Sequence, residues 1–400
     1  MDPPTLLDEA RQAFDDTVRL RRRIHRHPEV GLHLPGTQQA VLEALAGLRL
    51  DARPGERLSS VVAVLDGASP GPTILLRADM DALPILESTG LAFASEVDGV
   101  MHACGHDAHV AMLLGAARLL ATHRDQLAGR VLFAFQPGEE GYAGAKLMIE
   151  EGLLERDGTP TAAFALHVSP TDPPGEISTR PGPLMASGSG LEIVVRGRGG
   201  HASEPHDCLD PIPIACEIVQ ALQAYVTRRV NVFDPAVVTI TRIEAGTTGN
   251  AIPGAASLLG TIRTVSEDTR TRLFDGVRRL AEGIALAHGA EAEVRLRTGY
   301  PVLVNDVEVT DIVAEVARHL LGPDRVKILP APVMPSEDFS YILQRVPGAM
   351  VFLGARPDRE APAAPVHSSL MILDEAAMIA GSALHAAVAL RFLDPDRARR

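Results

Sequence analysis

Almost wholly apolar segments of strand length alternate with helical patterns along the first half of the chain. The strand-like segments are residues 60–65, 73–77, 131–135 and 162–166, and the helical patterns cover residues 5–27, 37–48, 107–123 and 143–151. Strands that are apolar on both faces occur in parallel sheets that helices cover on both sides. The pattern therefore predicts an α/β fold with a mostly parallel sheet.

The order of elements changes after residues 181–190, where prolines, glycines and serines predict a linker. The elements expected beyond it are strand 191–196, helix 209–228, strands 236–244 and 255–264, helix 267–288 and strand 291–297. This β-α-β-β-α-β order is that of the ferredoxin-like split unit. The first pattern then returns, with helices at 307–321, 336–345 and 374–394 and strands at 326–329 and 349–353.

The chain has 400 residues, which is more than one ordinary hydrophobic core holds. We therefore predict two domains. The first consists of residues 1–184 and 300–400 and carries the parallel sheet. The second, residues 185–299, is an inserted α+β domain of a common size.

Charge and apolar patterning exclude several classes of partner. The net charge of −13 argues against nucleic acid, and no uncharged apolar stretch reaches membrane-spanning length. The N-terminal Met-Asp-Pro-Pro-Thr lacks the basic region and apolar core of a signal peptide, and three cysteines suit a reducing compartment. We therefore expect a cytoplasmic protein without nucleic-acid or membrane partners. The Arg21-Arg22-Arg23 cluster is expected on a solvated helix face.

Candidate metal ligands lie where the predicted strands give way to loops. Cys104 and His106 lie in Met-His-Ala-Cys-Gly-His-Asp (101–107), His167 follows segment 162–166, and His367 lies in Val-His-Ser-Ser (366–369). Sites of open α/β sheets form outside the carboxyl ends of the strands. Each residue alone has a plain structural alternative, a buried cysteine or a core histidine. Their common edge favours a transition-metal hydrolase.

Adjacent carboxylates, Glu139 and Glu140, lie in Gln-Pro-Gly-Glu-Glu-Gly (136–141). Two neighbouring side chains of an extended loop cannot point the same way. One can bind a metal while the other acts as a general base on a metal-bound water. The alternative is a solvated acidic loop.

Five protein ligands are too many for one zinc ion, because a structural zinc uses four and a catalytic zinc usually three. The set is Cys104, His106, Glu140, His167 and His367. It predicts two divalent ions that share a bridging ligand, for which the thiolate of Cys104 is suited. Cysteine and histidine favour zinc, cobalt or nickel, and the carboxylate is compatible with manganese.

Other polar residues lie near these motifs, outside the set of expected metal ligands. In Arg-Ala-Asp-Met-Asp-Ala-Leu-Pro (77–84), we expect Asp81 to orient a metal-bound histidine, with an Asx turn as the alternative. The role of Asp79 stays open, as do those of His102 and His109. Asp107 is expected to cap the helix 107–123.

The inserted domain contains a second polar set. His201 lies in Gly-Gly-His-Ala-Ser-Glu-Pro (199–205), Asn250 in Gly-Asn-Ala-Ile-Pro (249–253), and Arg263 near the end of a predicted strand. An amide hydrolase needs a donor for the developing oxyanion and a group that binds a substrate carboxylate. Without further context, these three residues are also compatible with loop or surface positions.

Several motifs in the same order resemble those of the M20 metallopeptidases, and in particular the branch of hippurate hydrolases, N-acyl-amino-acid aminoacylases and plant auxin-conjugate hydrolases. The motifs are those quoted above together with Arg-Ile-His-Arg-His-Pro-Glu (23–29) and Ser-Glu-Asp-Phe (336–339). They span nearly the whole chain. The resemblance implies a di-metal catalytic domain and a smaller lid domain that also mediates dimerisation, so we expect a homodimer or higher homo-oligomer.

The resemblance also implies roles for individual residues. Cys104, His106, Glu140, His167 and His367 match the metal ligands, Glu139 the general base and Asp81 the orienting aspartate. His201 matches a lid histidine that stabilises the tetrahedral intermediate, often across the dimer. Asn250 and Arg263 match contacts to the substrate carboxylate.

The cysteine motif and Asp79 favour the N-acyl-amino-acid branch, because carboxypeptidase and dipeptidase branches have an aspartate bridge and a histidine at these positions. The expected reaction is the cleavage of an N-acyl amino acid of the hippurate or N-acetyl type. The alternatives are a dipeptidase or aminopeptidase of the same fold and a non-catalytic metal- or ligand-binding protein. Leu-His-Leu-Pro (32–35) stands where the family tends to have acidic residues, which predicts an altered acyl-side pocket.

Overall fold

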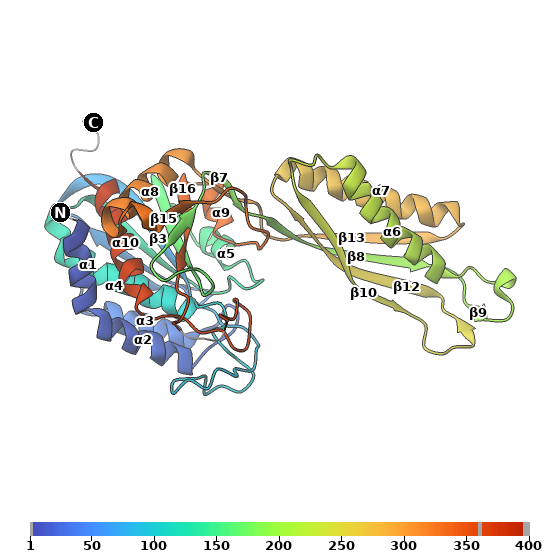
Figure 1. Ribbon diagram of the computed structural model, residues 1–400, viewed down its shortest axis with the longest axis horizontal. Helices are drawn as coiled ribbons and strands as arrows, with labels where there is room; N and C mark the ends of the chain where they lie inside the picture. Colours follow the sequence, from blue (N-terminus) through green and yellow to red (C-terminus); the bar gives the residue numbers. More distant parts are fainter. Residues whose placement is uncertain (1–2, 359–361, 395–400) are drawn as a thin grey trace. The chain divides into compact units, whose positions relative to one another are not determined.

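The computed structural model describes residues 3–358 and 362–394 (Figure 1). Two compact units are present. The first consists of Met1–Leu184, Val304–Ala331 and Tyr341–Arg400, and the second of Met185–Leu303 and Pro332–Ser340. Pro332–Ser340 thus belongs to the second unit, although the predicted boundaries assign it to the first. None of the described helices is both long and apolar enough to cross a membrane.

Among the described residues of the first unit, eight strands form a sheet in the order β1-β2-β4-β3-β5-β16-β6-β15. Their bounds are β1 Asp51–Pro54, β2 Val61–Asp66, β3 Ser69–Asp79, β4 Ala128–Gln136, β5 Ala162–Ser169, β6 Ile177–Thr179, β15 Val326–Ile328 and β16 Gly348–Gly354. The central pairs β4–β3, β3–β5 and β5–β16 are parallel. The predicted α/β class with a mostly parallel sheet is confirmed.

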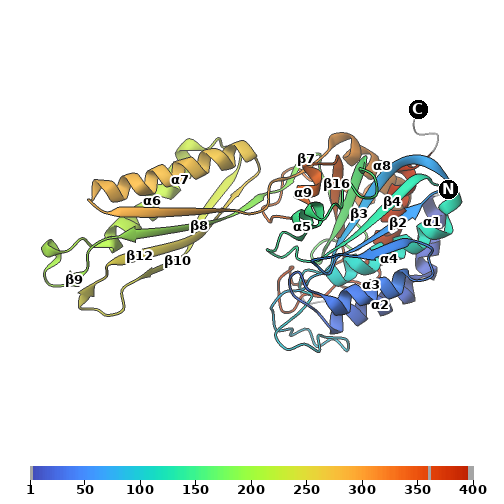
Figure 2. The same cartoon turned by 180° about the vertical axis from the view of Figure 1, so that it is seen from behind.

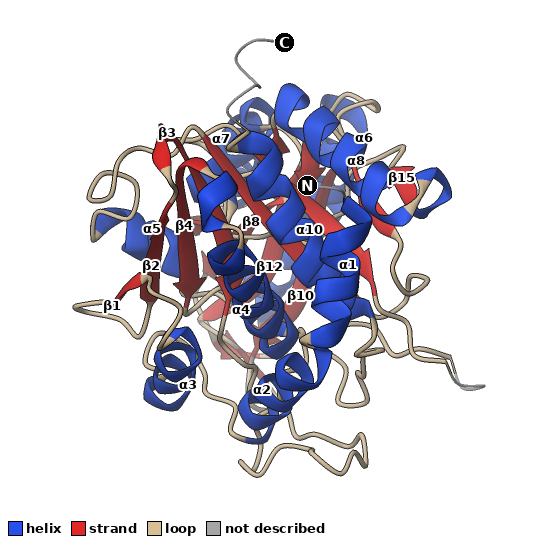
Figure 3. Ribbon diagram, turned by 90° about the vertical axis from the view of Figure 1, so that its left-hand side faces the viewer, coloured by secondary structure: helices blue, strands red, loops and turns tan. Residues whose placement is uncertain are grey.

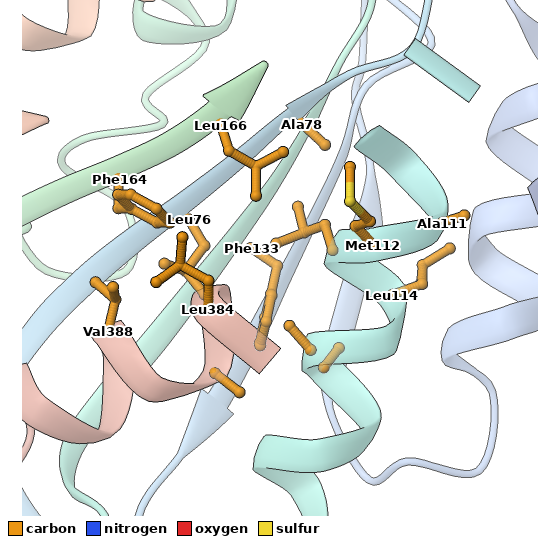
Figure 4. Close-up of a cluster of buried hydrophobic side chains, with 14 of the residues drawn as sticks. Leu76, Ala78, Ala111, Met112, Leu114, Phe133, Phe164, Leu166, Leu384 and Val388 are labelled. Atoms are coloured by element: carbon orange, nitrogen blue, oxygen red, sulfur yellow. The ribbon is translucent and has the colours of Figure 1, made fainter. Parts of the chain in front are cut away.

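The helices α4 and α10 lie against this sheet, as Figure 3 shows, and α2 packs on α4 (Figure 2). The helix bounds in this part of the fold are α1 Pro3–Gln12, α2 Phe14–Arg26, α3 Pro35–Leu45, α4 His106–Thr122, α5 Gly144–Glu150, α8 Val307–Leu321, α9 Ser340–Leu343 and α10 Ala377–Phe392, with short 3₁₀ turns at Arg124–Gln126 and Pro323–Arg325. The helix α4 is buried on nearly all sides. Figure 4 shows Met112 on the side of α4 that faces strand residues such as Phe133, and Leu114 on another side of the helix; both belong to the same buried core. A helix that is apolar all round is stable only in such a core.

Some local predictions are wrong. The single helix expected at 5–27 is divided at Ala13 into α1 and α2. The segment 181–190 is not an irregular linker, because β7 (Gly182–Met185) and the start of β8 (Ser187–Arg196) occupy most of it. The helix expected at 336–345 is reduced to α9.

The side chain of Arg21 is buried, contrary to the prediction of a solvated arginine cluster. Its Nε donates to Asp107 Oδ2 at 2.9 Å and its Nη1 to Glu375 Oε1 at 2.9 Å. A buried guanidinium needs such carboxylate partners, since an unpaired buried charge is strongly destabilising. Arg22 and Arg23 remain exposed.

The second unit has the element order β-α-β-β-α-β. Its bounds are β8 Ser187–Arg196, α6 Pro211–Arg229, β10 Ala236–Ala245, β12 Ala255–Thr264, α7 Glu267–Ala287 and β13 Glu291–Thr298, with short additional elements β9 Gly200–His201, Pro205–Asp207 (3₁₀) and β11 Ala251–Ile252. The strand β14, Leu303–Asn305, runs from the end of this unit into the first. The antiparallel sheet has the order β10-β12-β8-β13. Leu191, Ile193 and Val195 alternate along β8 and are buried with residues of α6 and α7 in a separate core.

Candidate metal centre

The five predicted ligands come together in the first unit, at the edge of the sheet where the central strands end. Cys104 and His106 flank Gly105, which begins α4 with a left-handed φ of 85°. Only glycine fits there, because a Cβ at this position would lie 2.5 Å from Val168 Cγ2. The other three ligands follow or end strands: Glu140 after β4, His167 near the end of β5 and His367 after β16.

Two groups of ligand atoms share one sulfur. The ligand atoms of Cys104, His106 and His167 lie within 4.8 Å of one another, and so do those of Cys104, Glu140 and His367. Within the first group, Cys104 Sγ lies 3.4 Å from His167 Nε2. Within the second, Glu140 Oε1 lies 3.1 Å from His367 Nε2. Cys104 is therefore placed where a bridging ligand would have to be.

The residues fit a pair of divalent ions. His106 Nε2 is buried and has no hydrogen-bond partner within the described part of the chain, and the buried Glu140 Oε1 faces only the ligand cluster, with His367 Nε2 at 3.1 Å. Buried polar atoms are rarely left unsatisfied without a reason, and a binding site for a metal ion is one such reason. The donors are one thiol, three imidazoles and one carboxylate, a set that suits zinc, cobalt or nickel and is compatible with manganese.

The metal-free site already favours an ionised thiol. Burial opposes ionisation of Cys104, but His167 and His106 outweigh it and lower the pKa of the thiol to about 6. Burial also opposes protonation of His167, yet the nearby thiolate raises the pKa of that imidazole to about 9. Hydrogen bonds to Cys104 and Glu140 raise the pKa of His367 to about 10. A thiolate is the form that binds metal, so the site is electrostatically prepared for cations.

Asp81 holds the loop that carries both glutamates. Its Oδ1 accepts a hydrogen bond from the Glu139 N–H at 2.9 Å, and its Oδ2 accepts one from the Glu140 N–H at 3.0 Å. Asp81 Oδ1 also lies 3.4 Å from His106 Nδ1. Carboxylate oxygens of Glu139 and Glu140 lie within 4.8 Å of a ring nitrogen of His106 and of each other. The carboxylate of Glu139 is buried at the ligand cluster.

Asp79 and His109 form a buried pair beside the ligands. His109 Nδ1 donates to Asp79 Oδ1 at 2.6 Å, and the Val168 N–H donates to His109 Nε2 at 2.9 Å. Both ring nitrogens are thus engaged, so His109 is not available as a ligand. Burial lowers the pKa of His109 to about 4. Burial alone would raise the pKa of Asp79, but Arg77, His106 and His109 hold it well below its usual value.

Asp107 does not cap α4, contrary to the sequence-based expectation. The cap position is Gly105, and Asp107 Oδ2 accepts hydrogen bonds from Arg21 Nε at 2.9 Å and His25 Nδ1 at 2.8 Å. Burial alone would lower the pKa of His25, but the interaction with Asp107 outweighs burial and raises this pKa to about 9. His25 has no predicted role in supporting the site, although it lies in the motif at 23–29. His102 is buried next to these groups, and burial lowers its pKa to about 3.

The three polar site residues predicted in the second unit lie at two separate positions. His201 is exposed on β9, where its Nδ1 accepts from the Ser203 N–H at 3.2 Å, which leaves the ring proton on Nε2. Asn250 is adjacent, because its backbone carbonyl oxygen accepts a hydrogen bond from the Ala202 N–H at 3.1 Å. Arg263 lies near the C-terminal end of β12, away from His201 and Asn250, and its Nη1 donates a hydrogen bond to Ser336 Oγ at 2.7 Å. Burial lowers the pKa of its half-buried guanidinium.

Comparison with known proteins identifies the family. A model of peptidase family M20/M25/M40 matches residues 75–391. The chain belongs to this family. It is 40% identical over 391 residues to thermostable carboxypeptidase 1 of Saccharolobus solfataricus, covering 97% of this chain and 98% of that protein. It is 39% identical over 378 residues to N-acetylcysteine deacetylase of Bacillus subtilis, covering 94% and 97%.

A solved M20 structure has the same fold. The YxeP protein of Bacillus subtilis, described as a dinuclear metal-binding peptidase, superposes with a TM-score of 0.82 at 36% identity, over 96% of this chain and 99% of that one. The resemblance inferred from the motifs is confirmed, and membership of a peptidase family makes the chain a hydrolase of amide bonds. The M20 relatives include a carboxypeptidase as similar as a deacetylase, so overall similarity does not separate these two activities.

Proposed function

We propose that this M20 chain is an amidohydrolase that uses two divalent metal ions to cleave N-acyl amino acids into a carboxylic acid and an amino acid. The observation that carries the proposal is the shared position of Cys104 in two ligand groups, beside the buried carboxylate of Glu139. Relatives named N-acetylcysteine deacetylase and IAA-amino acid hydrolase support the substrate class.

Each ion is assigned one group of ligands. Cys104, His106 and His167 form one group, and Cys104, Glu140 and His367 form the other. Zinc, cobalt, nickel or manganese suits these donors. When bound, such ions lower the pKa of water toward neutrality and polarise an amide carbonyl.

The remaining roles belong to side chains of the protein. Glu139 takes the proton from the attacking water and delivers it to the leaving nitrogen. Asp81 fixes the backbone from which Glu139 projects, through its hydrogen bond to the Glu139 N–H. His201 presents the proton on Nε2 to the developing oxyanion. Asn250 and Arg263 are the proposed groups for the substrate carboxylate; because they lie toward opposite ends of β12, only one of them in a given subunit can bind a given carboxylate.

A substrate panel tests this proposal. Hippurate, N-acetyl amino acids, indole-acetyl conjugates and dipeptides are each assayed with zinc, cobalt, nickel and manganese. We expect N-acyl amino acids to be hydrolysed faster than dipeptides. The corresponding N-acyl amino-acid amides, in which a carboxamide replaces the carboxylate, should be poor substrates. Absence of hydrolysis of every N-acyl amino acid with every metal would contradict the proposal.

A carboxypeptidase or dipeptidase activity is the second candidate, because the relative from Saccharolobus solfataricus carries the name carboxypeptidase. Faster cleavage of dipeptides than of N-acetyl amino acids in the same panel would favour it. The non-catalytic alternative is not retained, because the chain belongs to a peptidase family and a candidate base, Glu139, accompanies the ligand set.

We further propose a homodimer formed by the second unit, which would act as a lid, and a cytoplasmic location. The edge strand β10 supports the dimer, because Val237 and Ile243 on it are exposed and its outer edge is open to pairing within the described residues. The three cysteines are all free thiols, which supports a reducing compartment. Sedimentation velocity of the purified protein tests the dimer.

A further inference from the structure

The main sheet opens beside the metal centre. Strands β3 and β5 pair only as far as Arg77 and Ala165. Beyond that point β3 continues to Asp79 alongside β4, and β5 continues to Ser169 alongside β16. The N–H groups of β5 that face β3 therefore lose their strand partner, and a buried N–H needs another acceptor.

His109 provides that acceptor from α4. Its Nε2 accepts the Val168 N–H at 2.9 Å, and its Nδ1–H donates to Asp79 Oδ1 at 2.6 Å. Because Nε2 accepts, the ring proton must be on Nδ1, so the tautomer is fixed. Asp79 is itself held by Arg77 Nη1 at 2.7 Å. An imidazole thus spans the gap between the two strands.

The backbone of Val168 is engaged through both its N–H and its carbonyl oxygen. Its N–H donates to His109, and its carbonyl oxygen accepts from His167 Nδ1 at 2.8 Å. This second bond places the proton of His167 on Nδ1 and leaves Nε2 to face Cys104 Sγ at 3.4 Å. Gly105, between the other two ligands of this group, approaches the Val168 side chain too closely for any Cβ. Val168 is therefore the point at which α4 and β5 fix the spacing of their ligands.

We propose that His109 is a positioning residue of the metal centre: by joining Asp79 of β3 to Val168 of β5, it sets the place and tautomer of the His167 imidazole relative to Cys104 and His106. This inference rests on the proposed function, because it requires those three residues to bind metal. His109 itself binds no metal, although it lies within ligand distance of Asp79 and His106, since both its nitrogens are already used.

Three substitutions separate the two ends of this bridge. His109→Gln keeps an acceptor near the position of Nε2, His109→Asn keeps a donor near that of Nδ1, and His109→Leu keeps neither. Co²⁺ is titrated into each metal-free protein, and binding is followed by the thiolate-to-cobalt charge-transfer band and by competition with a chelator. We expect His109→Leu and His109→Asn to bind Co²⁺ about 10- to 100-fold more weakly with an altered band, and His109→Gln to remain closer to wild type.

A matched control is His385→Leu on α10. His385 is an equally buried imidazole with a low pKa caused by burial, and it packs on Phe164 with ring centroids 5.0 Å apart. Its substitution should leave Co²⁺ affinity and the band unchanged, and circular dichroism of the metal-free proteins checks folding. Wild-type protein that binds no Co²⁺ would overturn the proposed function itself. Wild-type binding together with unchanged binding by His109→Leu, or better binding by His109→Asn than by His109→Gln, would overturn the role of His109.

Discussion

The carboxylate of Asp81 accepts a 2.9 Å hydrogen bond from the backbone N–H of Glu139. Its other oxygen binds the next N–H, so one side chain fixes two consecutive peptides. Asp81→Ala leaves both donors without this partner, at a cost of about 1–3 kcal/mol for a buried group. We expect kcat to fall about 10- to 100-fold with a smaller change in KM. Asp81→Asn retains one acceptor, so its kcat should lie between those of wild type and Asp81→Ala. A kcat of Asp81→Ala equal to that of wild type would exclude this role.

Glu139→Gln should separate metal binding from turnover. The amide has nearly the same shape but cannot accept the proton of water, so we expect normal metal content and a fall in kcat of about 10²- to 10⁴-fold. Elemental analysis and steady-state kinetics measure the two effects. Glu140→Gln is the matched comparison and should lose metal. Near-normal hydrolysis by Glu139→Gln would rule out Glu139 as the base.

Cys104→Ala should weaken the binding of both ions, because the sulfur belongs to both ligand groups. His367→Ala removes a ligand of only one group, so it should leave one ion bound tightly. Metal stoichiometry after dialysis distinguishes the two results. A Cys104→Ala protein that retains one ion with wild-type affinity would show that the sulfur is not shared.

His25 should make the stability of the metal-free protein depend on pH. Its pKa is raised from 6.5 to about 9 in the folded chain, with the interaction with Asp107 outweighing burial. Because the folded pKa is the higher one, the stabilisation by protonated His25 is complete below pH 6.5 and is lost as the pH rises through about 9. In urea unfolding, the stability difference between wild type and His25→Gln should therefore shrink over this interval. A difference that stays constant across it would argue against a charged His25.

His201→Ala should lower kcat without changing the fold, because it removes the donor proposed for the oxyanion. If His201 acts across a dimer, mixing His201→Ala with Glu139→Gln should restore part of the activity, since a mixed dimer contains one complete site. No recovery on mixing, with mixed dimers shown to form, would place His201 in the same subunit as the centre it serves.

Much of the fold was accessible from the sequence because its central elements have clear periods. The strands around Leu76, Phe133 and Phe164 are continuous apolar runs, and helices such as α2, α5 and α8 end within two residues of a proline or glycine. Short strands such as β6 and β15 were missed or only approximate, because three residues carry no period.

The ligands were predictable for a similar reason: each follows a strand, and parallel strands bring such positions to one edge. Their supporting contacts were not. Asp107 is a residue type that often caps helices, but its carboxylate instead accepts hydrogen bonds from Arg21 and His25. These two residues are 86 and 82 positions away in the sequence. The roles of Asp79 and His109 depend on where two strands part, which no local pattern indicates.

The burial of α4 on nearly all sides has a consequence for the rigidity of the site. Cys104 and His106 are attached to the first turn of a helix that cannot shift without disturbing the core, so the ligands are arranged during folding rather than by the arriving ion. At the far side of this helix, a Cβ at Gly381 of α10 would meet Met112 Sδ at 2.1 Å. That atom is near the end of a flexible side chain and can shift, so a packing change there is absorbed before it reaches the metal-binding atoms, whereas any Cβ at Gly105 would press directly on Val168.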